Sequence, residues 1–220
     1  MFVTLLLGQC AALRPPSGVA SAGGSPIELS RRALLLPALA AASGPGFPRA
    51  ASAADLNLKD YTDTRYGVTF GIPSGWSAQP SELADGRRII TAADPDDVDF
   101  NVFCTFTPIR PDYSGLGSFG TIDYVASTIL PQCGASGACR LEGGDGIEGR
   151  MIEQAVVKGN YVYDYTIEQR GGPKRHLRSV IGIKADGGSS ILVGLGAQCL
   201  NTRYDAEKAA IKAVVDSFKL

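Results

Sequence analysis

Alternating apolar and polar residues predict a β-rich domain over most of the chain. Val68, Phe70 and Ile72 alternate with small or polar residues, which is the two-residue period of a half-buried strand. The Pro-Ser-Gly that follows predicts a turn into Trp76, which we expect to be a core anchor. Further strands are predicted at 88–91, 100–107, 147–157, 161–169, 176–184 and 190–199, with Pro108 ending the second of these.

Two helices are predicted beside these strands, over residues 121–130 and 205–218, because apolar positions recur there at helical spacing. Turn sequences at 158–160, 170–173 and 186–188 join the last four strands. Consecutive hairpins predict an antiparallel sheet, and two amphipathic helices have to bury their apolar stripes on it. The sequence therefore predicts one compact α+β domain.

The first 54 residues predict a targeting segment. Arg31-Arg32 precedes an apolar run at 33–42, and Ala51-Ser52-Ala53 is a small-residue cleavage pattern. Paired arginines before a short apolar run are typical of the twin-arginine export route, which carries folded cargo. The run is about half the roughly 20 residues that a membrane-spanning helix needs. We therefore expect a leader at 1–54 and a mature domain at 55–220.

The paired arginines lie far from the start of the chain, and this spacing suggests a second signal. Thirty residues precede Arg31, with four serines and one acid, which is typical of an organelle transit peptide. A transit peptide followed by a twin-arginine signal indicates import into a chloroplast and transfer to the thylakoid lumen. Two alternatives remain open: residues 1–13 as a signal peptide for a plastid inside the endomembrane system, or a bacterial exported protein with a misassigned start codon.

Composition and charge exclude some classes of protein. The chain has 45% hydrophobic and 20% charged residues, as expected of a globular protein. Its net charge is −1, and the leader holds four arginines and one acid, which leaves about −4 on residues 55–220. A mildly acidic domain argues against nucleic acid as a partner, because phosphate binding needs a basic surface.

Four cysteines remain once Cys10 is removed with the leader. Cys104, Cys133, Cys139 and Cys199 are disulfide candidates, because an even number in an export compartment favours pairing, and all three connectivities are open. A bond between Cys133 and Cys139 would close a short loop and contribute roughly 2 kcal/mol by chain entropy. Cys104 and Cys199 lie in apolar strands, where buried free thiols are the alternative.

Several short motifs along residues 61–220 follow an order found in one known family. Residues 67–76 contain a glycine, an aromatic residue and Pro-Ser-x-Trp, and Ser217-Phe218 stands near the end. Together with a lumenal leader, this order resembles the PsbP-like proteins of photosystem II. The other motifs that carry the resemblance are Thr107-Pro108, Phe119-Gly120, Gly171-Gly172, Lys174, His176, Asp186-Gly187, Ala197-Gln198 and Tyr204, where the family often has Trp.

The resemblance implies a fold and a location. The fold is an α-β-α sandwich of the PsbP/Mog1-like type, with a central antiparallel sheet between helices, and the location is the thylakoid lumen. The founding member is an extrinsic subunit of the oxygen-evolving complex that aids the retention of calcium and chloride. Only a few residues separate Ala54 from Tyr61, whereas the founding subunit has a longer extension there that docks on photosystem II. This difference favours a PsbP domain-containing relative.

The function expected from the resemblance is therefore that of a non-catalytic protein. It would be peripheral to the lumenal face of the thylakoid membrane and would bind photosystem II or its assembly intermediates. The alternatives are a photosystem I assembly factor, and a lumenal metal-binding protein or enzyme centred on His176, the only histidine.

A metal site and a docking patch are both predicted near residue 176. The family's metal-associated positions correspond to His176 and Asn201, which makes these two the candidate ligands for calcium, manganese or zinc. The amide of Asn201 is a weaker ligand than a carboxylate, and the alternative is a surface histidine on a hairpin. Lys174, Arg175 and Arg178 form a basic cluster, either a patch that docks on an acidic lumenal surface or a solvated hairpin.

Other motifs are interpreted as structural. Residues 115–120 read G-x-G-x-x-G, but no parallel βαβ unit accompanies them, so we expect a flexible loop. His176 has no G-x-S-x-G nucleophile elbow to serve. The acidic run at 94–99 lacks the glycine and glutamate of a calcium loop and predicts an exposed turn.

Overall fold

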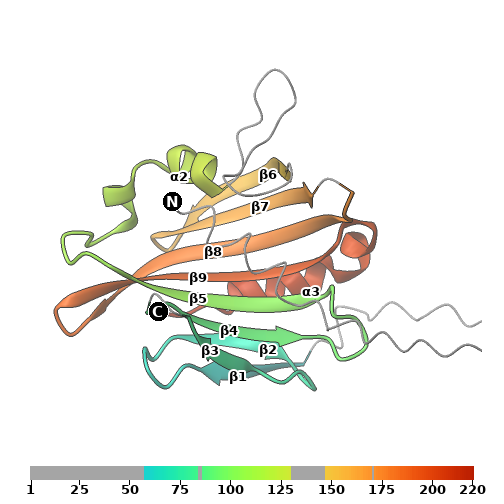
Figure 1. The fold of residues 1–220 in the computed structure, drawn as a ribbon, viewed down its shortest axis with the longest axis horizontal. Helices are drawn as coiled ribbons and strands as arrows, with labels where there is room; N and C mark the ends of the chain where they lie inside the picture. The colour runs from blue at the N-terminus through green and yellow to red at the C-terminus, as the bar shows by residue number, and fades with distance from the viewer. Residues whose placement is uncertain (1–56, 84–85, 130–146, 170) are drawn as a thin grey trace, which may run out of the picture.

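The computed structural model describes residues 57–83, 86–129, 147–169 and 171–220, and strands dominate within them (Figure 1). Seven strands form one antiparallel sheet in the order β3-β4-β5-β9-β8-β7-β6, and β1 and β2 form a separate antiparallel ribbon. The strands are β1 (Leu58–Thr62), β2 (Thr69–Pro73), β3 (Gln79–Glu82), β4 (Arg88–Ala93), β5 (Asn101–Ile109), β6 (Ile147–Val157), β7 (Asn160–Gln169), β8 (Lys174–Asp186) and β9 (Ser189–Leu200).

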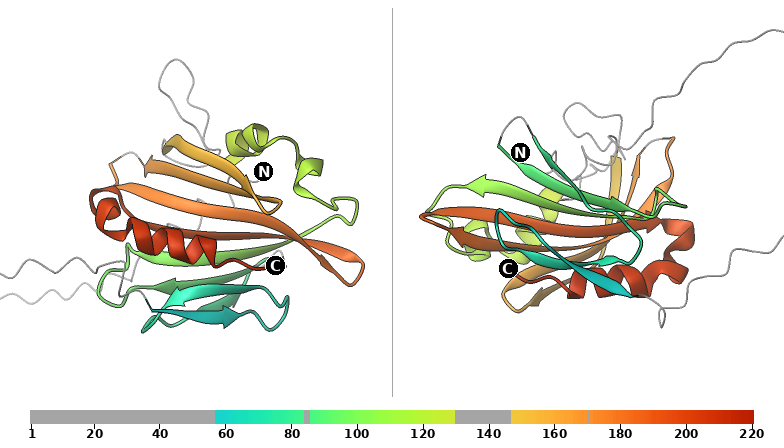
Figure 2. Two further views of the ribbon diagram at one scale, coloured as in Figure 1. Left: turned by 180° about the vertical axis from the view of Figure 1, so that it is seen from behind. Right: turned by 90° about the horizontal axis from the view of Figure 1, so that it is seen from below.

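Each face of the large sheet carries one α-helix. α3 (Tyr204–Asp216) packs on one face and α2 (Ile122–Ile129) packs on the other, and the two views of Figure 2 show α3 lying along the sheet. Short 3₁₀ helices, η2 (Leu116–Phe119) and η3 (Asn201–Arg203), precede them. The predicted α+β class with an α-β-α arrangement is confirmed.

Alternate residues of the central strands form the floor beneath α3. Ile211 and Val214 of α3 have no exposed surface and pack onto this floor. Trp76 stands edge-on against Phe100 with ring centroids 4.8 Å apart, so its predicted role as a core anchor is confirmed. The floor residues are Val102, Cys104 and Phe106 of β5 with Val193, Leu195 and Ala197 of β9.

Tyrosines of β7 hold α2 on the opposite face. The hydroxyl of Tyr161 donates to the carbonyl oxygen of Gly120 at 3.1 Å, and that of Tyr163 donates to the carbonyl oxygen of Ile122 at 3.2 Å. Both rings are buried, so they contribute apolar area as well as a hydrogen bond to the start of the helix. Leu116 of η2 is buried in the same cluster. The prediction of a flexible loop at 115–120 was therefore wrong.

An ion pair and a set of hydrogen bonds are two of the places where the ribbon of β1 and β2 is attached to the rest of the domain. Arg88 of β4 forms an ion pair with the buried carboxylate of Asp63, with 3.0 Å between Nε and Oδ2. At the other place the backbone N–H of Gly71 donates to Ser217 Oγ at 2.7 Å, and Thr69 and Lys219 exchange backbone hydrogen bonds. Residues Ser217 and Lys219, which follow α3, thus hold β2 in place.

Differences from the predicted strands have local causes. β1 and β3 were not predicted: β3 reads Gln-Pro-Ser-Glu and is exposed throughout, so it has no apolar alternation. β5 continues past Pro108 to Ile109, because Pro108 still pairs in register with Ile191. The acidic run at 94–99 does form a turn, and it is closed by backbone hydrogen bonds between Asp94 and Phe100 and between Phe100 and Asp97.

The close approach of Phe103 to Gly196 generates a prediction. A Cβ at Gly196 would lie 2.4 Å from Cζ of Phe103, so Gly196→Ala should force the ring to move and cost about 1–3 kcal/mol of unfolding free energy. Urea denaturation measures this loss. Phe103→Leu in the same chain should recover part of it, because the two changes are coupled. Gly117→Ala, where a Cβ meets nothing within 4 Å, is the matched control. Equal losses at Gly117 and Gly196 would contradict the prediction.

Candidate functional site

Four polar side chains meet between the sheet and the start of α3. Asp164 comes from β7, His176 and Arg178 come from β8, and Tyr204 is the first residue of α3. The register pairs Asp164 with Arg178 and Thr166 with His176, so strand alternation places all of them on the α3 face. Asp164 and His176 are each 5% exposed. We call these four residues the Asp164 cluster.

Asp164 is the acceptor at the centre of this cluster. His176 Nε2 lies 2.5 Å from Asp164 Oδ1, and an ionised carboxylate only accepts, so Nε2 carries the proton. Oδ2 accepts from the Tyr204 hydroxyl at 3.0 Å and from Arg178 Nη1 at 3.2 Å. The rings of His176 and Tyr204 stack with centroids 3.2 Å apart and planes within 4°. The helix start is thus joined to both strands.

The hydrogen bonds decide the charge state of the cluster. Burial acts to raise the pKa of the Asp164 carboxyl, but the hydrogen bonds from His176, Tyr204 and Arg178 outweigh burial and lower that pKa below its usual 3.8. Burial, followed by the nearby Asp164 carboxylate, raises the pKa of the Tyr204 phenol. Asp164 therefore stays ionised and Tyr204 stays protonated, which are the states that their hydrogen bond requires.

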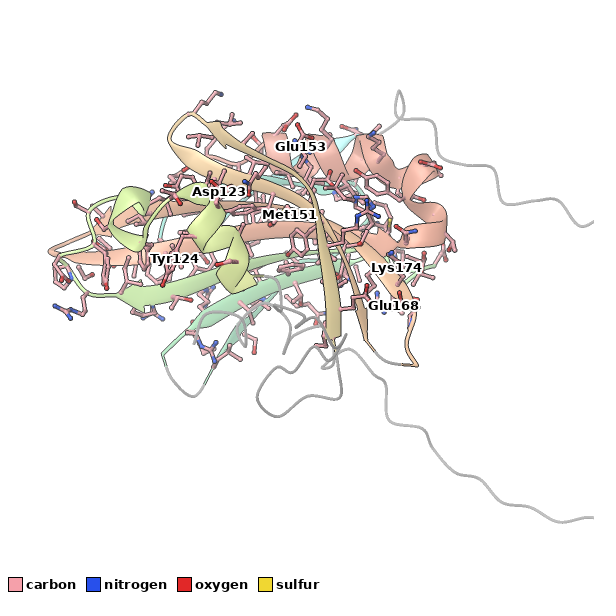
Figure 3. All side chains as sticks on the ribbon, turned by 90° about the horizontal axis from the view of Figure 1, so that it is seen from above. Asp123, Tyr124, Met151, Glu153, Glu168 and Lys174 are labelled. Atoms are coloured by element: carbon pink, nitrogen blue, oxygen red, sulfur yellow. The ribbon has the colours of Figure 1, made fainter. Side chains whose placement is uncertain are left out.

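Further ion pairs surround the cluster and use the predicted docking residues. Arg175 Nη2 lies 2.5 Å from Asp99 Oδ1, so the acidic turn is tied to β8. Arg178 also approaches Glu153 of β6 at 3.8 Å. Lys174 is exposed beside its cross-strand neighbour Glu168 (Figure 3). Arg175 and Arg178 thus form ion pairs within the folded domain, whereas Lys174 is exposed to solvent.

The two candidate metal ligands are placed differently. His176 is buried and bonded to Asp164, so its interpretation as a surface histidine was wrong. Asn201 is exposed in η3. Within the part of the chain that the structure describes, no three His, Cys, Asp or Glu side chains could together hold a metal ion. The described residues thus offer no such cluster for calcium, manganese or zinc, and a metal at His176 and Asn201 stays a prediction from the resemblance.

Cys199 lies directly across from His176, which suggests a Cys-His-Asp arrangement. Burial, with Glu207 adding to it, raises the pKa of the Cys199 thiol to about 12. Its side chain has no exposed surface, so the nucleophilic thiolate is disfavoured and out of reach of a substrate. The neighbouring histidine therefore does not activate Cys199.

The other cysteines divide between described and undescribed residues. Cys104 is buried on β5 opposite Leu195, and burial raises the pKa of its thiol. Cys104 and Cys199 are both free thiols in the structure. Cys133 and Cys139 lie outside the described residues, so their predicted loop-closing bond stays a prediction.

Sequence reasoning found two members of the Asp164 cluster and missed the other two as partners. Asp164 stands between Tyr163 and Tyr165 in a strand with several large apolar residues, and a carboxylate buried in that pattern needs a cationic partner. Period-two alternation alone would have placed it on the same face as Val162 and Thr166. Tyr204 lay at a recognisable motif position, but only the docking of α3 brings it to Asp164.

A seven-stranded antiparallel sheet with one helix on each face defines an α+β domain with α-β-α layers. The family model for PsbP matches residues 56–220, and the chain belongs to the PsbP family. The chain is a PsbP-domain protein rather than the oxygen-evolving subunit itself. Within the described residues, none of the helices has the length and apolarity needed to cross a membrane.

Three known proteins have a sequence or a fold similar to that of this chain. PsbP domain-containing protein 3, chloroplastic, of Arabidopsis thaliana is 27% identical over 160 residues, 72% of this chain; the chain spans 63% of that relative's length. The solution structure of cyanobacterial PsbP (CyanoP) from Synechocystis sp. PCC 6803 is similar with a TM-score of 0.55 and 21% identity, over 74% of this chain and 92% of that one. Saccharomyces cerevisiae Ran-binding protein Mog1p has a TM-score of 0.39 and 12% identity, over 74% and 95%.

The charge state of Asp164 generates a prediction about pH. Its pKa is lower in the folded state than in the unfolded state, so its contribution to stability is present above pH 3.8 and is lost as the pH falls through the folded pKa. Asp164→Asn leaves Arg178 without its buried partner and should cost about 3–5 kcal/mol at neutral pH. That cost, measured by urea denaturation, should shrink as the solution is acidified below pH 3.8.

Two further variants control this experiment. Asp186→Asn changes an exposed carboxylate on the same sheet and should give little difference at any pH. Tyr204→Phe removes one hydrogen bond to Asp164 and should cost about 1 kcal/mol of unfolding free energy. This milder variant still tests the cluster if Asp164→Asn does not fold. A cost for Asp164→Asn that is constant across the whole pH range would refute the assignment.

Proposed function

We propose that this chain is a non-catalytic protein of the thylakoid lumen that binds photosystem II or one of its assembly intermediates. The observation that carries the proposal is the PsbP family match, which extends over residues 56–220. A relative named as chloroplastic supports the compartment. The predicted leader at 1–54, with Arg31-Arg32, supports the lumen, although these residues lie outside the described part of the chain.

The Asp164 cluster supports a binding role rather than a catalytic one. Its carboxylate already accepts three hydrogen bonds, and His176 spends Nε2 on one of them. Asp164 and His176 are buried between the sheet and α3, and the thiol next to them is held neutral. A general base needs to reach a substrate proton, and this histidine instead joins α3 to the sheet. Function is then expected at the surface of the domain.

Of the three residues in the predicted docking patch, only Lys174 has an exposed side chain that no ion pair among the described residues engages. Arg175 and Arg178 are engaged by Asp99 and Asp164, whereas Lys174 is exposed at the start of β8. We keep all three residues in the proposed patch, with Lys174 as the group that meets an acidic partner surface. A charge at such a rim position raises the association rate more than the affinity.

Import into isolated chloroplasts tests the proposed location and partner together. The full chain with a C-terminal tag should be processed, become resistant to protease inside thylakoids, and co-migrate with photosystem II complexes on native gels. Arg31→Lys with Arg32→Lys should leave the protein in the stroma, because the twin-arginine signal is impaired. Accumulation in another compartment would contradict the location. Co-migration with photosystem I alone would favour the alternative assembly role.

Charge reversal at Lys174 tests the patch without disturbing the fold. Lys174→Glu should slow association with isolated photosystem II membranes several-fold at low salt, and the difference should fade at high salt. Lys59→Glu, an exposed lysine on β1, is the matched control. Arg175→Glu and Arg178→Glu are unsuitable, because each would break an ion pair of the folded domain. Identical binding by the Lys174 and Lys59 variants would remove the patch from the proposal.

A further inference from the structure

β6 is an edge strand that carries an apolar surface. It is the last strand of the seven-stranded sheet and pairs with β7 on one side, while the described residues supply no strand on its other side (Figures 1 and 3). An unpaired edge presents a row of backbone N–H and C=O groups that can pair with another chain. β6 extends over Ile147–Val157, which makes it long for an edge strand.

Exposed apolar side chains concentrate at this edge. The described residues include six exposed large hydrophobic side chains, and four of them lie on β6 or α2. These are Ile152 at 55%, Val156 at 60% and Val157 at 47% of β6, with Tyr124 at 61% on the neighbouring helix. Figure 3 looks onto this side of the molecule and shows Tyr124 on α2, with Met151 and Glu153 on β6. Such a concentration marks an interaction surface.

A β-bulge divides β6 and sets which residues share a face. The register shifts between Met151 and Glu153, so that Ile152 has no partner on β7. Arg150 pairs with Thr166, and Glu153 pairs with Asp164, so both charged residues lie on the α3 face although they are three apart. Ile147 pairs with Gln169 and Val156 pairs with Tyr161, so these two residues of β6 both lie on the α2 face.

We propose that β6 pairs antiparallel with β6 of a second copy of this chain, about a twofold axis perpendicular to the sheet. Such an axis keeps the α3 faces of both copies on one side. The bulge then restricts the register, because residues on the α3 face must meet residues on the same face. One register that satisfies this condition puts Arg150 opposite Glu153 of the second copy, and symmetry repeats the pair.

Two further pairs of positions agree with this register. Ile147 falls opposite Val156 of the second copy, so apolar side chains meet on the α2 face. Glu148 falls opposite Ala155, so no like charges are opposed. The charge pattern of β6 is thus complementary to itself, which is why a second copy is favoured over an unrelated strand. The paired edge is smaller than a standard interface, so the dimer should be weak and concentration-dependent.

Sedimentation of the full chain over a range of concentrations tests the pairing. The average mass should rise from 23.0 kDa toward twice that value as the concentration increases. Arg150→Glu should weaken dimerisation at least about tenfold, because it opposes two acids at both symmetric positions. The double change Arg150→Glu with Glu153→Arg should restore it. Val156→Lys should also weaken dimerisation, since it opposes a charge to Ile147.

Controls and contrary results are equally specific. Lys59→Glu lies on β1 in the separate ribbon and should leave the dimer unchanged. Circular dichroism of each variant should match the parent, since the altered side chains are exposed and Arg178, which Glu153 approaches, keeps its ion pair with Asp164. A chain that remains at 23.0 kDa up to about 100 μM overturns the proposal. So does a dimer that is indifferent to both Arg150→Glu and Val156→Lys, or an edge that pairs only with a strand of another protein.

Discussion

The structure depends on β9, because this strand pairs with β5 on one side and β8 on the other and so joins the two halves of the large sheet. Residues 190–199 are all buried, and both faces of the strand are covered. On one face, Gly194 and Gly196 make room for Thr105 and Phe103; on the other, Leu195 and Ala197 support α3. A strand covered on both faces has to be apolar or very small at nearly every position, as this one is.

The fold could be predicted where the sequence carried a regular period. β6 to β9 and α3 were predicted nearly to their ends, because alternation and Gly-rich turns mark hairpins clearly. β1 and β3 escaped prediction because their side chains are largely exposed and polar. η2 was taken for a loop because Gly115, Gly117 and Gly120 lie in and beside it, and only one of its side chains, Leu116, is buried.

The candidate site was harder to predict than the fold. His176 was identified as chemically distinctive, yet its burial and its bond to Asp164 depend on three elements that meet only after α3 docks. The basic cluster was visible in the sequence, but its role was not. The carboxylates that engage Arg175 and Arg178 lie in a distant turn and a neighbouring strand, so only the folded domain brings them together. Side-chain chemistry is local, whereas the partners of a buried charge are set by tertiary packing.

The bond from Gly71 to Ser217 has a consequence for how the chain acquires its structure. The ribbon of β1 and β2 is held by Ser217, which lies 146 residues after Gly71, so a nascent domain lacks this attachment until Ser217 has been made. A contact between residues 146 positions apart also closes a long loop, and such contacts form late for entropic reasons. Attachment of the ribbon is therefore expected only after Ser217 and Lys219 have been synthesised.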